Sequence, residues 1–302
     1  MDLLKKFLTF IAWGFVAIFA ITIMAGFLAV VVLFARGVGE EDLGSYSVKT
    51  SAAVGVVDLH GEIISSDKFR ASLKKFADDK KIKAVVIRID SPGGSVGASE
   101  EMYRAIKETN EKKPVVCSLG NIAASGGLYA SLGCRKVVTN EGTLTGSIGV
   151  ILMIPNVSTL LNRFGLDMTI VKSGKFKDAG SPFHPLGEEE RGLLQALVNQ
   201  TYEQFVRAVA GARGLSVEAV KKFADGRVVL GEDAVKIGLA DEIGGLSRAA
   251  KLALVAANIN DEPEIVVPKP GGLPAWFVDN EESFLSWFKS RSSVRLLFQL
   301  DL

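Results

Sequence analysis

An uncharged, strongly apolar run from Phe7 to Ala35 is the feature that most constrains how this chain can fold. It exceeds the roughly 20 residues that a helix needs to cross a bilayer. A cleaved signal peptide has a shorter apolar core of about 7–15 residues, so an uncleaved anchor is favoured over a signal peptide. Lys5 and Lys6 precede the run, and acidic residues at 40–42 follow it. The positive-inside rule then predicts a single-pass protein of the plasma (inner) membrane, with a cytoplasmic N-terminus and the remaining chain on the extracytoplasmic side.

Shifts in composition divide the chain into four segments. Residues 1–36 hold a short cytoplasmic stub and the anchor, and residues 37–50 are rich in Gly, Ser and acids, as is typical of a linker. Residues 51–257 form the folded domain, which is long enough for one sizeable core or two small ones. Residues 258–302 hold a Pro-rich connector and an aromatic, amphipathic tail. The formal net charge is +1, so no nucleic acid is implied as a partner.

Strand-like and helix-like segments alternate through the folded domain. Runs of β-branched residues predict the strands, and helical spacing of apolar residues predicts the helices between them. The clearest helix covers 188–212, with acids in its first turn and glycines at its end. This alternation predicts an α/β fold with a core of parallel strands and helices on both faces. The expected strands are 53–59, 84–89, 114–119, 136–139, 149–154 and 168–172, and the other expected helices are 65–76, 99–109, 125–132, 159–164 and 217–223, followed by a strand-turn-helix segment at 227–240.

The two cysteines, Cys117 and Cys134, are each flanked by apolar residues typical of strands. Buried free thiols are favoured over a disulfide, because the sequence does not fix the distance between the two side chains. No group of Cys or His residues has the spacing of metal ligands. We therefore expect neither a metal nor a cofactor.

The C-terminal tail places apolar residues at i, i+3 and i+4 spacing, interleaved with basic residues. This pattern predicts an amphipathic helix that either packs on a partner surface or lies at the bilayer interface. Packing is favoured, because the polar face carries acids as well. The apolar positions are Phe284, Trp287, Phe288, Val294, Leu297 and Phe298.

Ser125 lies in the run Asn121-Ile-Ala-Ala-Ser-Gly-Gly127 and is the candidate nucleophile. The neighbouring Ala and Gly residues leave space around the hydroxyl, and the N–H of Gly126 at a helix N-terminus can bind an oxyanion. The alternative is an ordinary helix N-cap, for which Ser is a preferred residue. The only histidines, His60 and His184, each adjoin a glycine or proline in a predicted loop, so neither is well placed to activate the serine.

Lysine is the other side chain that can activate a serine, once its ammonium has lost a proton. Lys172, Lys175 and Lys177 are the local candidates, and any of them can instead be an ordinary solvated charge. A lysine base needs burial or hydrogen bonds that favour the neutral amine, and the tight, partly apolar segment after Lys177 favours that residue. Ser147 is a candidate to accept a hydrogen bond and orient the amine, or else a plain turn serine.

The segment Asp90-Ser-Pro-Gly-Gly-Ser95 is a turn that can expose backbone N–H groups. Its two glycines allow positive φ angles and the close approach of a substrate carbonyl. The N–H of Gly93 or Gly94 can then bind a tetrahedral oxyanion, a contribution of about 3–4 kcal/mol in comparable sites. The alternative is a simple turn after a strand. Sheet edges near 94–96 and 149–152 can hold an extended peptide by strand addition.

Taken together, these motifs resemble the signal peptide peptidase A (protease IV) family, whose fold is related to those of Clp protease and crotonase. The resemblance runs from about Val54 to Ala250, and the chain length resembles the short, single-repeat form of the family. At the position after Ser-Pro-Phe, where the family often has arginine, this chain has His184. The motifs are Asp90–Ser95, Ala124–Gly127, Thr145–Val150, Gly174–Asp178 with Ser181–Phe183, and Gly226–Val228 through Gly238–Gly244.

The resemblance implies a serine endopeptidase with Ser125 as nucleophile, Lys177 as general base and Ser147 as the residue that orients the base. It also implies substrates such as remnant signal peptides and other extended apolar peptides. A single-repeat chain is expected to share its sites between subunits of a ring-shaped homo-oligomer. The alternatives are a non-catalytic membrane scaffold or assembly protein on the same fold and, less favoured, acyl-CoA chemistry on a crotonase fold.

Overall fold

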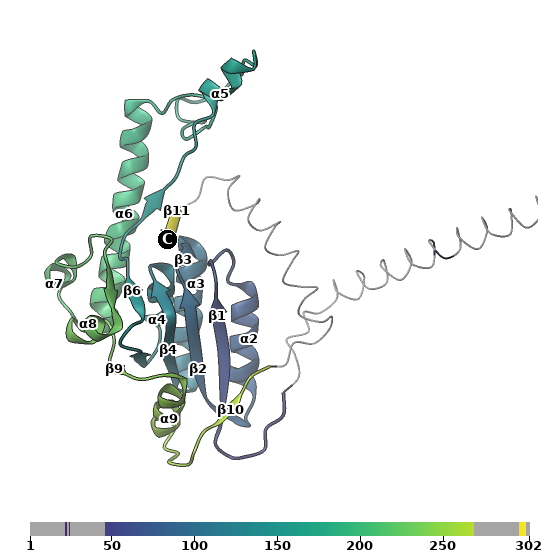
Figure 1. Ribbon diagram of the computed structural model, residues 1–302, viewed down its shortest axis with the longest axis vertical. Helices are drawn as coiled ribbons and strands as arrows, with labels where there is room; N and C mark the ends of the chain where they lie inside the picture. The colour runs from purple at the N-terminus through teal and green to yellow at the C-terminus, as the bar shows by residue number, and fades with distance from the viewer. Residues whose placement is uncertain (1–21, 23, 25–45, 269–295, 300–302) are drawn as a thin grey trace, which may run out of the picture. The chain divides into compact units, whose positions relative to one another are not determined.

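The structure is a computed structural model and describes residues 22, 24, 46–268 and 296–299 (Figure 1). The predicted anchor at 7–35 lies outside these residues, apart from two of its positions. Within the part of the chain that the structure describes, no helix is both long and apolar enough to cross a membrane. The larger of the chain's two units comprises Tyr46–Lys269 and Leu273–Leu302, and all elements named below belong to it.

An eight-stranded mixed sheet forms the centre of this unit (Figure 1). Along the path β10-β1-β2-β4-β5-β9, all neighbouring strands are parallel. β6 pairs with β4 in parallel, and β8 pairs with β6 in antiparallel orientation, so the sheet is not purely parallel as predicted. The strands are β1 (Ala53–His60), β2 (Ile82–Ser91), β4 (Val115–Ala124), β5 (Lys136–Thr139), β6 (Leu144–Gly146), β8 (Val228–Leu230), β9 (Glu242–Ile243) and β10 (Glu264–Val266).

Helices cover both faces of the sheet, as the strand–helix alternation predicts. Successive residues of a strand point to opposite faces, so Val85 packs in one buried cluster and Val86 in another. The Val85 cluster includes apolar residues of α2 (Asp67–Asp78), α3 (Val96–Lys112), α4 (Gly126–Ser131), α6 (Glu188–Arg213) and α7 (Val217–Lys221). The Val86 cluster includes α9 (Leu246–Ala256). Burial on both faces explains why the central strands are rich in Val and Ile.

Most predicted elements are present, and the strongly patterned ones match best. The helix expected at 188–212 is α6, and the strand expected at 136–139 is β5. The strand predicted at 168–172 is wrong, because these residues form no strand and are all exposed. Helix α9 and strand β10 were not predicted. A β-branched run forms a strand only where a neighbouring strand completes its hydrogen bonds, and residues 168–172 pair with none of the strands that the structure describes.

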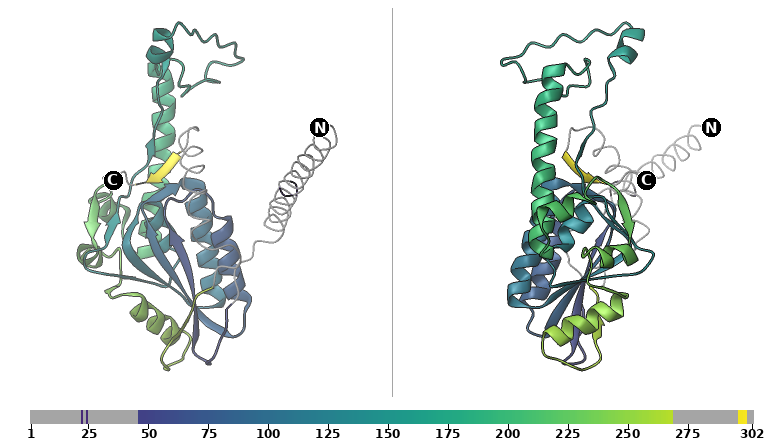
Figure 2. Two further views of the ribbon diagram at one scale, coloured as in Figure 1. Left: turned by 45° about the vertical axis from the view of Figure 1, so that its right-hand side comes forward. Right: turned by 90° about the vertical axis from the view of Figure 1, so that its left-hand side faces the viewer.

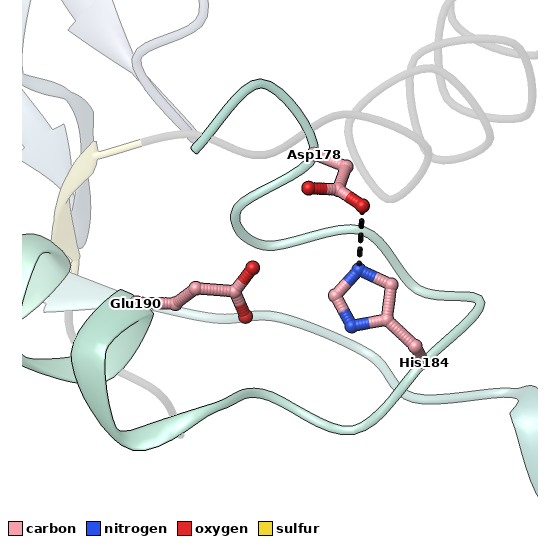
Figure 3. A group of neighbouring side chains, drawn as sticks. All are labelled: Asp178, His184 and Glu190. Atoms are coloured by element: carbon pink, nitrogen blue, oxygen red, sulfur yellow. Dashed lines mark ion pairs between the residues drawn. The ribbon is translucent and has the colours of Figure 1, made fainter. Parts of the chain in front are cut away.

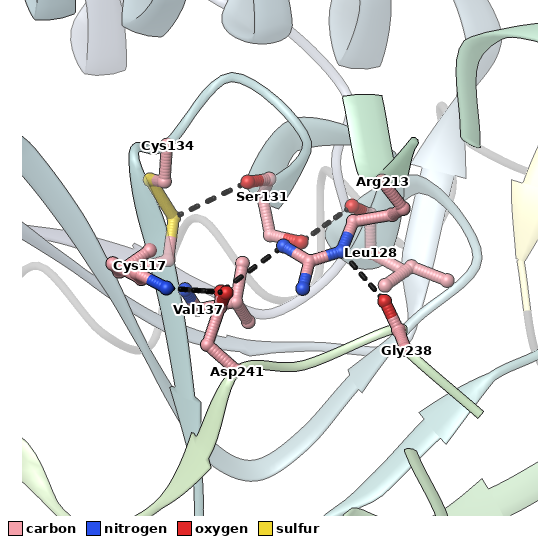
Figure 4. Close-up of polar contacts among 9 residues, drawn as sticks. Cys117, Leu128, Ser131, Cys134, Val137, Arg213, Gly238 and Asp241 are labelled. Carbon is pink, nitrogen blue, oxygen red and sulfur yellow. Dashed lines mark hydrogen bonds and ion pairs between the residues drawn. A yellow bond between two sulfur atoms is a disulfide. The ribbon is translucent and has the colours of Figure 1, made fainter. Parts of the chain in front are cut away.

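Cys117 in β4 and Cys134 after α4 form a disulfide, with their Cα atoms 5.8 Å apart (Figure 4). The expectation of free thiols was wrong. Helix α4 is short, and the chain turns back after it to begin β5 beside β4. This return brings two cysteines that are 17 residues apart in the sequence into the same layer of the structure.

Asp241 joins the end of α6 to the sheet (Figure 4). Its carboxylate accepts hydrogen bonds from the Val137 N–H at 2.7 Å and from Arg213 Nη1 at 3.1 Å. The Nε of Arg213 also donates to the Gly238 carbonyl at 2.7 Å. Burial acts to raise the pKa of Asp241, but the hydrogen bonds from Arg213 and Val137 outweigh burial and lower it. The ionised carboxylate therefore holds the C-terminal end of α6 to strand β5.

Residues 153–187 form a segment that we call the arm, which connects β7 (Ile151–Leu152) to α6 and contains α5 (Ser158–Arg163). In both sets of views the arm lies at the end of α6 that is farther from the sheet (Figures 1 and 2). Every residue from 162 to 177 is exposed. The exposed apolar residues of the arm are Met153, Leu160, Phe164, Leu166, Met168, Ile170, Val171, Phe176 and Phe183.

A separate three-stranded sheet contains the C-terminal strand β11 (Leu296–Gln299) between β3 (Gly93–Ser95) and β7. Both pairings of β11 are antiparallel, with Phe298 opposite Gly94 and Leu297 opposite Ile151. The helix predicted for the tail is therefore wrong at residues 296–298. The rest of that predicted helix lies outside the described residues.

Candidate active site

Ser125 occupies the junction between β4 and α4 in an unusual backbone conformation, with φ 51° and ψ −112°. Its N–H donates to the Gly146 carbonyl at 2.9 Å, and its own carbonyl accepts from the Tyr129 N–H at 2.8 Å. Among the described non-glycine residues, only Ser125, Ser147 and Asn258 have positive φ. Such a conformation costs about 1–3 kcal/mol and persists only where the surrounding structure imposes it. Two of these three residues are the serines that the sequence singled out.

The Ser125 hydroxyl is buried and unpaired. The residue is 1% exposed, and its Oγ has no hydrogen-bond partner among the described residues. A buried hydroxyl without a partner costs about 1–3 kcal/mol, and native proteins rarely retain one without a functional reason. The hydroxyl is therefore able to donate its hydrogen to a group outside the described part of the chain.

The glycine-rich turn predicted to bind an oxyanion is held close to the start of α4. Gly93 and Gly94 have φ angles of 107° and 155°, and α4 packs against β3. A side chain at Gly94 would place its Cβ 2.2 Å from the Ile63 carbonyl oxygen, and one at Gly127 would place it 2.9 Å from that of Ser91. Only glycine fits either position, so the turn and the helix start can approach each other closely.

Ser91 contributes to this turn in a way that was not predicted from the sequence. Its Oγ accepts the Gly93 N–H at 3.1 Å, so this N–H is already hydrogen-bonded in the structure. The signal was present in the sequence, because a Ser two residues before a turn glycine commonly accepts its N–H.

Ser147 lies directly after Gly146, the residue that binds the Ser125 N–H. It is 5% exposed, has φ 52°, and donates its own N–H to the Arg227 carbonyl at 2.8 Å. Strands β4 and β6 run in parallel here, with Ala124 paired to Gly146. The structure thus brings Ser147, Ser125 and the glycine turn to one end of the sheet.

Lys177 is the predicted site residue that a single chain does not bring to this place. It is exposed and lies in the arm between α5 and α6. Lys172 forms an ion pair with Asp178, and Lys175 forms one with Glu189 at 2.5 Å. Lys177 has no ion pair or side-chain hydrogen bond with any residue that the structure describes. Of the three competing lysines, it is the one without an ion pair in the part of the chain that the structure describes.

Residues 107–260 match the family model described as Peptidase family S49. The chain is also 42% identical over 231 residues to a Synechocystis protein named "Putative protease", an alignment covering 74% of this chain and 83% of the relative. This chain belongs to peptidase family S49. The resemblance inferred from its motifs is thereby confirmed, and the chain is a protease of the S49 family by descent.

Other S49 relatives carry more specific names. The chain is 40% identical to the "Putative signal peptide peptidase SppA" of Enterococcus faecium, over 61% of this chain and 54% of the relative. It is 34% identical to "Protease 4" of Haemophilus influenzae, over 77% of this chain and 39% of the relative. Among solved structures, a ClpP1 mutant from Listeria monocytogenes is similar, with 20% identity, a TM-score of 0.45, and coverage of 65% of this chain and 94% of that one.

Proposed function

We propose that this S49 protease is a serine endopeptidase in which Ser125 is the nucleophile and Lys177 of a neighbouring copy is the general base. The observation that carries the proposal is the buried Ser125 hydroxyl, which has no partner among the described residues of its own chain. The exposed Lys177, without an ion pair in the described part of the chain, supplies the complementary group.

The proposed reaction follows from these positions. The neutral Lys177 amine takes the Ser125 proton as Oγ bonds to the peptide carbonyl carbon, and the resulting ammonium then protonates the departing amine. Water releases the acyl group in a second round of the same proton transfers. Because the Gly93 N–H is already bound to Ser91, we assign the oxyanion first to the N–H groups of Gly94 and Gly126. Ser147 orients the lysine amine.

The apolar surface of the arm supports a site shared between subunits. Apolar side chains at 164–176 are exposed in one chain, and contiguous exposed apolar surface commonly marks an interface. A neighbour that covers the arm would also bury Lys177, which favours the neutral amine that a base requires. A heterologous interface that closes on itself gives a ring.

The substrate proposed is an extended apolar peptide, such as a remnant signal peptide. The pairing of β11 with β3 and β7 supports this, because an extended segment of the same chain already adds a strand between these two edges beside the glycine turn. The Ala and Gly residues around Ser125 favour small or apolar residues at the scissile bond. A peptide screen that shows a preference for Lys or Asp there would contradict this assignment.

Peptide binding at the position of β11, between β3 and β7, can be tested separately. If β11 occupies the position of the substrate, deletion of residues 296–302 removes a competitor and lowers KM, while kcat changes little. An unchanged KM would show that peptides bind elsewhere.

We also propose that the protein is anchored in the plasma (inner) membrane by 7–35, with the protease domain on the extracytoplasmic side. The Cys117–Cys134 disulfide supports this location, because structural disulfides persist in oxidising compartments and are rare in the cytosol. The orientation is tested with two reporters fused to the C-terminus, one active only outside the cytoplasm and one active only in the cytosol. We expect activity from the first fusion. Activity from the cytosolic reporter alone would contradict the proposed orientation.

The decisive experiment is complementation between two inactive variants. Ser125→Ala and Lys177→Ala chains are each expected to be folded and inactive. When they are mixed under conditions of subunit exchange, about a quarter of the interfaces should pair an intact serine with an intact lysine, so activity should return to about that fraction. If both variants fold, demonstrably co-assemble and stay inactive, the site does not combine groups from two chains.

A further inference from the structure

We propose that Asp178, His184 and Glu190 form a binding site for a divalent transition-metal ion, with Zn²⁺ as the best-matched ion. One ligand atom from each of the three side chains lies within 4.8 Å of the other two. Asp178 and His184 come from the last part of the arm, and Glu190 comes from the first turn of α6. The three side chains converge on one point (Figure 3). Each ligand is six residues from the next in the sequence, and this spacing did not identify them as a group.

The imidazole of His184 provides the main argument. Its Nδ1 lies 2.9 Å from the Pro185 carbonyl oxygen, which can only accept, so Nδ1 carries the hydrogen. In the neutral ring, Nε2 then presents a lone pair. This Nε2 atom is buried, although the His184 side chain is 30% exposed, and it lies 3.2 Å from Asp178 Oδ2, with which it forms an ion pair only when the ring is protonated. Two acceptor atoms in such a position repel each other unless a cation lies between them.

The separation of these two atoms suits a metal ion. Two ligands of a tetrahedral zinc centre, with bonds of about 2.0–2.1 Å, lie about 3.3 Å from each other. The 3.2 Å from Nε2 to Oδ2 already matches this distance. A carboxylate oxygen of Glu190 lies within 4.8 Å of the other two ligand atoms, and Glu190 would have to move closer to complete a tetrahedral centre.

The atoms behind the three ligands are arranged as in known metal centres. A metal-bound imidazole usually donates its other N–H to a carbonyl, as His184 does to Pro185. Asp178 uses its other oxygen to accept from Lys172, and Glu190 Oε2 accepts the Gly187 N–H at 3.0 Å. The partners of His184 and Asp178 orient these two ligands, so that His184 Nε2 and Asp178 Oδ2 face the proposed metal position.

The charge of the surrounding pocket also fits a divalent ion. The pocket has a volume of about 470 Å³ and is lined by two lysines, four carboxylates and His184. With a neutral imidazole, its side chains carry two uncompensated negative charges. Acids in the first turn of α6 are also stabilised by the helix dipole, so they do not by themselves indicate a cation. The neutral nitrogen ligand is what favours a transition metal over Ca²⁺ or Mg²⁺, which prefer oxygen ligands.

The competing arrangement is a protonated His184 in an ion pair with Asp178. The hydrogen bond to Pro185 raises the pKa of His184, and Glu190 and Asp178 raise it further, so an imidazolium is the natural occupant at low pH. The charged groups facing the ring are Asp178 and Glu190, with Lys172 behind Asp178. The variant His184→Arg distinguishes the two arrangements. Arginine keeps the ion pair with Asp178, but it cannot bind a metal ion.

A bound ion would link the end of the arm to α6 directly beside Lys177. Only this consequence rests on the proposed function, since binding itself is measured without substrate. Metal would then be expected to lower the mobility of the segment that carries the base, and so to raise kcat in the assembled enzyme.

The test uses the full-length protein, stripped with a chelator at neutral pH. Zn²⁺ binding is measured by competition with a chromophoric chelator, and Co²⁺ is added separately to record its visible spectrum. The variants are His184→Arg, which retains the ion pair to Asp178, and Glu190→Gln, whose amide oxygen can still accept the Gly187 N–H. His60→Gln, at the only other histidine, and Glu189→Gln, in the same pocket, are the matched controls.

We expect one Zn²⁺ per chain, a Co²⁺ spectrum typical of a nitrogen- and oxygen-ligated site, and an increase in Tm on adding Zn²⁺. His184→Arg should weaken binding by a factor of about a hundred or more and abolish the increase in Tm, and Glu190→Gln should weaken binding by about tenfold or more. Both controls should bind as the wild type does. The proposal is overturned if the wild type binds no Zn²⁺, if folded His184→Arg binds it equally well, or if either control loses binding.

Discussion

The sheet end that carries Ser125 and the arm that carries Lys177 differ in almost every physical respect. Around Ser125, the strands and α4 are buried, and hydrogen bonds fix the backbone on both sides of the serine. From 162 to 177, by contrast, every residue is exposed, although several are large and apolar. The strained backbone at Ser125, the proposed nucleophile, is held by the fold of a single chain. The apolar residues of the arm are left exposed by that fold, which is why we propose that a neighbouring copy covers them.

This contrast indicates a division of work within the proposed dyad. The fold of a single chain is sufficient to position the proposed nucleophile, the glycine turn and Ser147. The proposed base lies on a segment with few buried residues, and such segments have low local stability until something covers them. Assembly would then complete the site, so the activity of the protein would depend on its concentration.

Substitutions of the two dyad residues should have the largest effect on activity. Ser125→Ala and Lys177→Ala are each expected to lower kcat by at least about a thousandfold, because each removes a group that acts in both proton-transfer rounds. Lys175→Ala is the matched control and should retain most activity. Hydrolysis of an apolar peptide ester by purified protein measures all three. If Lys175→Ala is inactive and Lys177→Ala is not, the base assignment is wrong.

Substitutions of two apolar residues, one in the core and one in the arm, compare the two regions. Phe76 in α2 is fully buried, and Phe76→Ala should lower the free energy of unfolding by about 3–5 kcal/mol. Val171 in the arm is 95% exposed, and Val171→Asp should change the unfolding free energy of the monomer by no more than about 0.5 kcal/mol. The same change should weaken self-association.

Denaturant unfolding and sedimentation velocity provide the two measurements for this pair. A Val171→Asp chain that assembles as well as the wild type would show that the exposed arm residue is not at an interface. A large loss of monomer stability would show that the arm packs on its own chain.

The Cys117–Cys134 disulfide should raise the free energy of unfolding of the folded domain. Closing a loop of 17 residues corresponds to about 3 kcal/mol of unfolding free energy in the chain-entropy model. Cys134→Ser, Cys117→Ser and the double variant all lack the disulfide. Each should lower the free energy of unfolding by about this amount under non-reducing conditions. Thiol titration of the unfolded wild type checks the premise, and two free thiols without reductant would contradict it.

Asp241 should make a smaller contribution to stability than Phe76 or the disulfide, and its contribution should depend on pH. Since its pKa is lowered in the folded chain, its contribution to stability is fully present above the pKa of the unfolded state, about 4, and is lost as the pH falls through the folded value. Asp241→Asn should lower the unfolding free energy by about 1–3 kcal/mol at neutral pH and much less in acid. Equal losses at both pH values would show that the carboxylate charge is not responsible.

Much of the core could be predicted from the sequence, because its signals are local. Alternating β-branched and amphipathic segments gave most of the helices and central strands, and the runs around Gly93, Ser125 and Ser147 gave the candidate site residues. The family followed from the order of these motifs. Each of these features depends on residue types within a few positions of each other.

Contacts between distant segments were decided only by the tertiary structure. The disulfide depends on the return of the chain beside β4, the strand β11 on the two free edges of β3 and β7, and the cluster around His184 on the turn between the arm and α6. The predicted strand at 168–172 failed for the same reason, since a strand exists only with a neighbour. Sequence periodicity fixes which face of an element is apolar. Which surface covers that face is decided by the assembled chain.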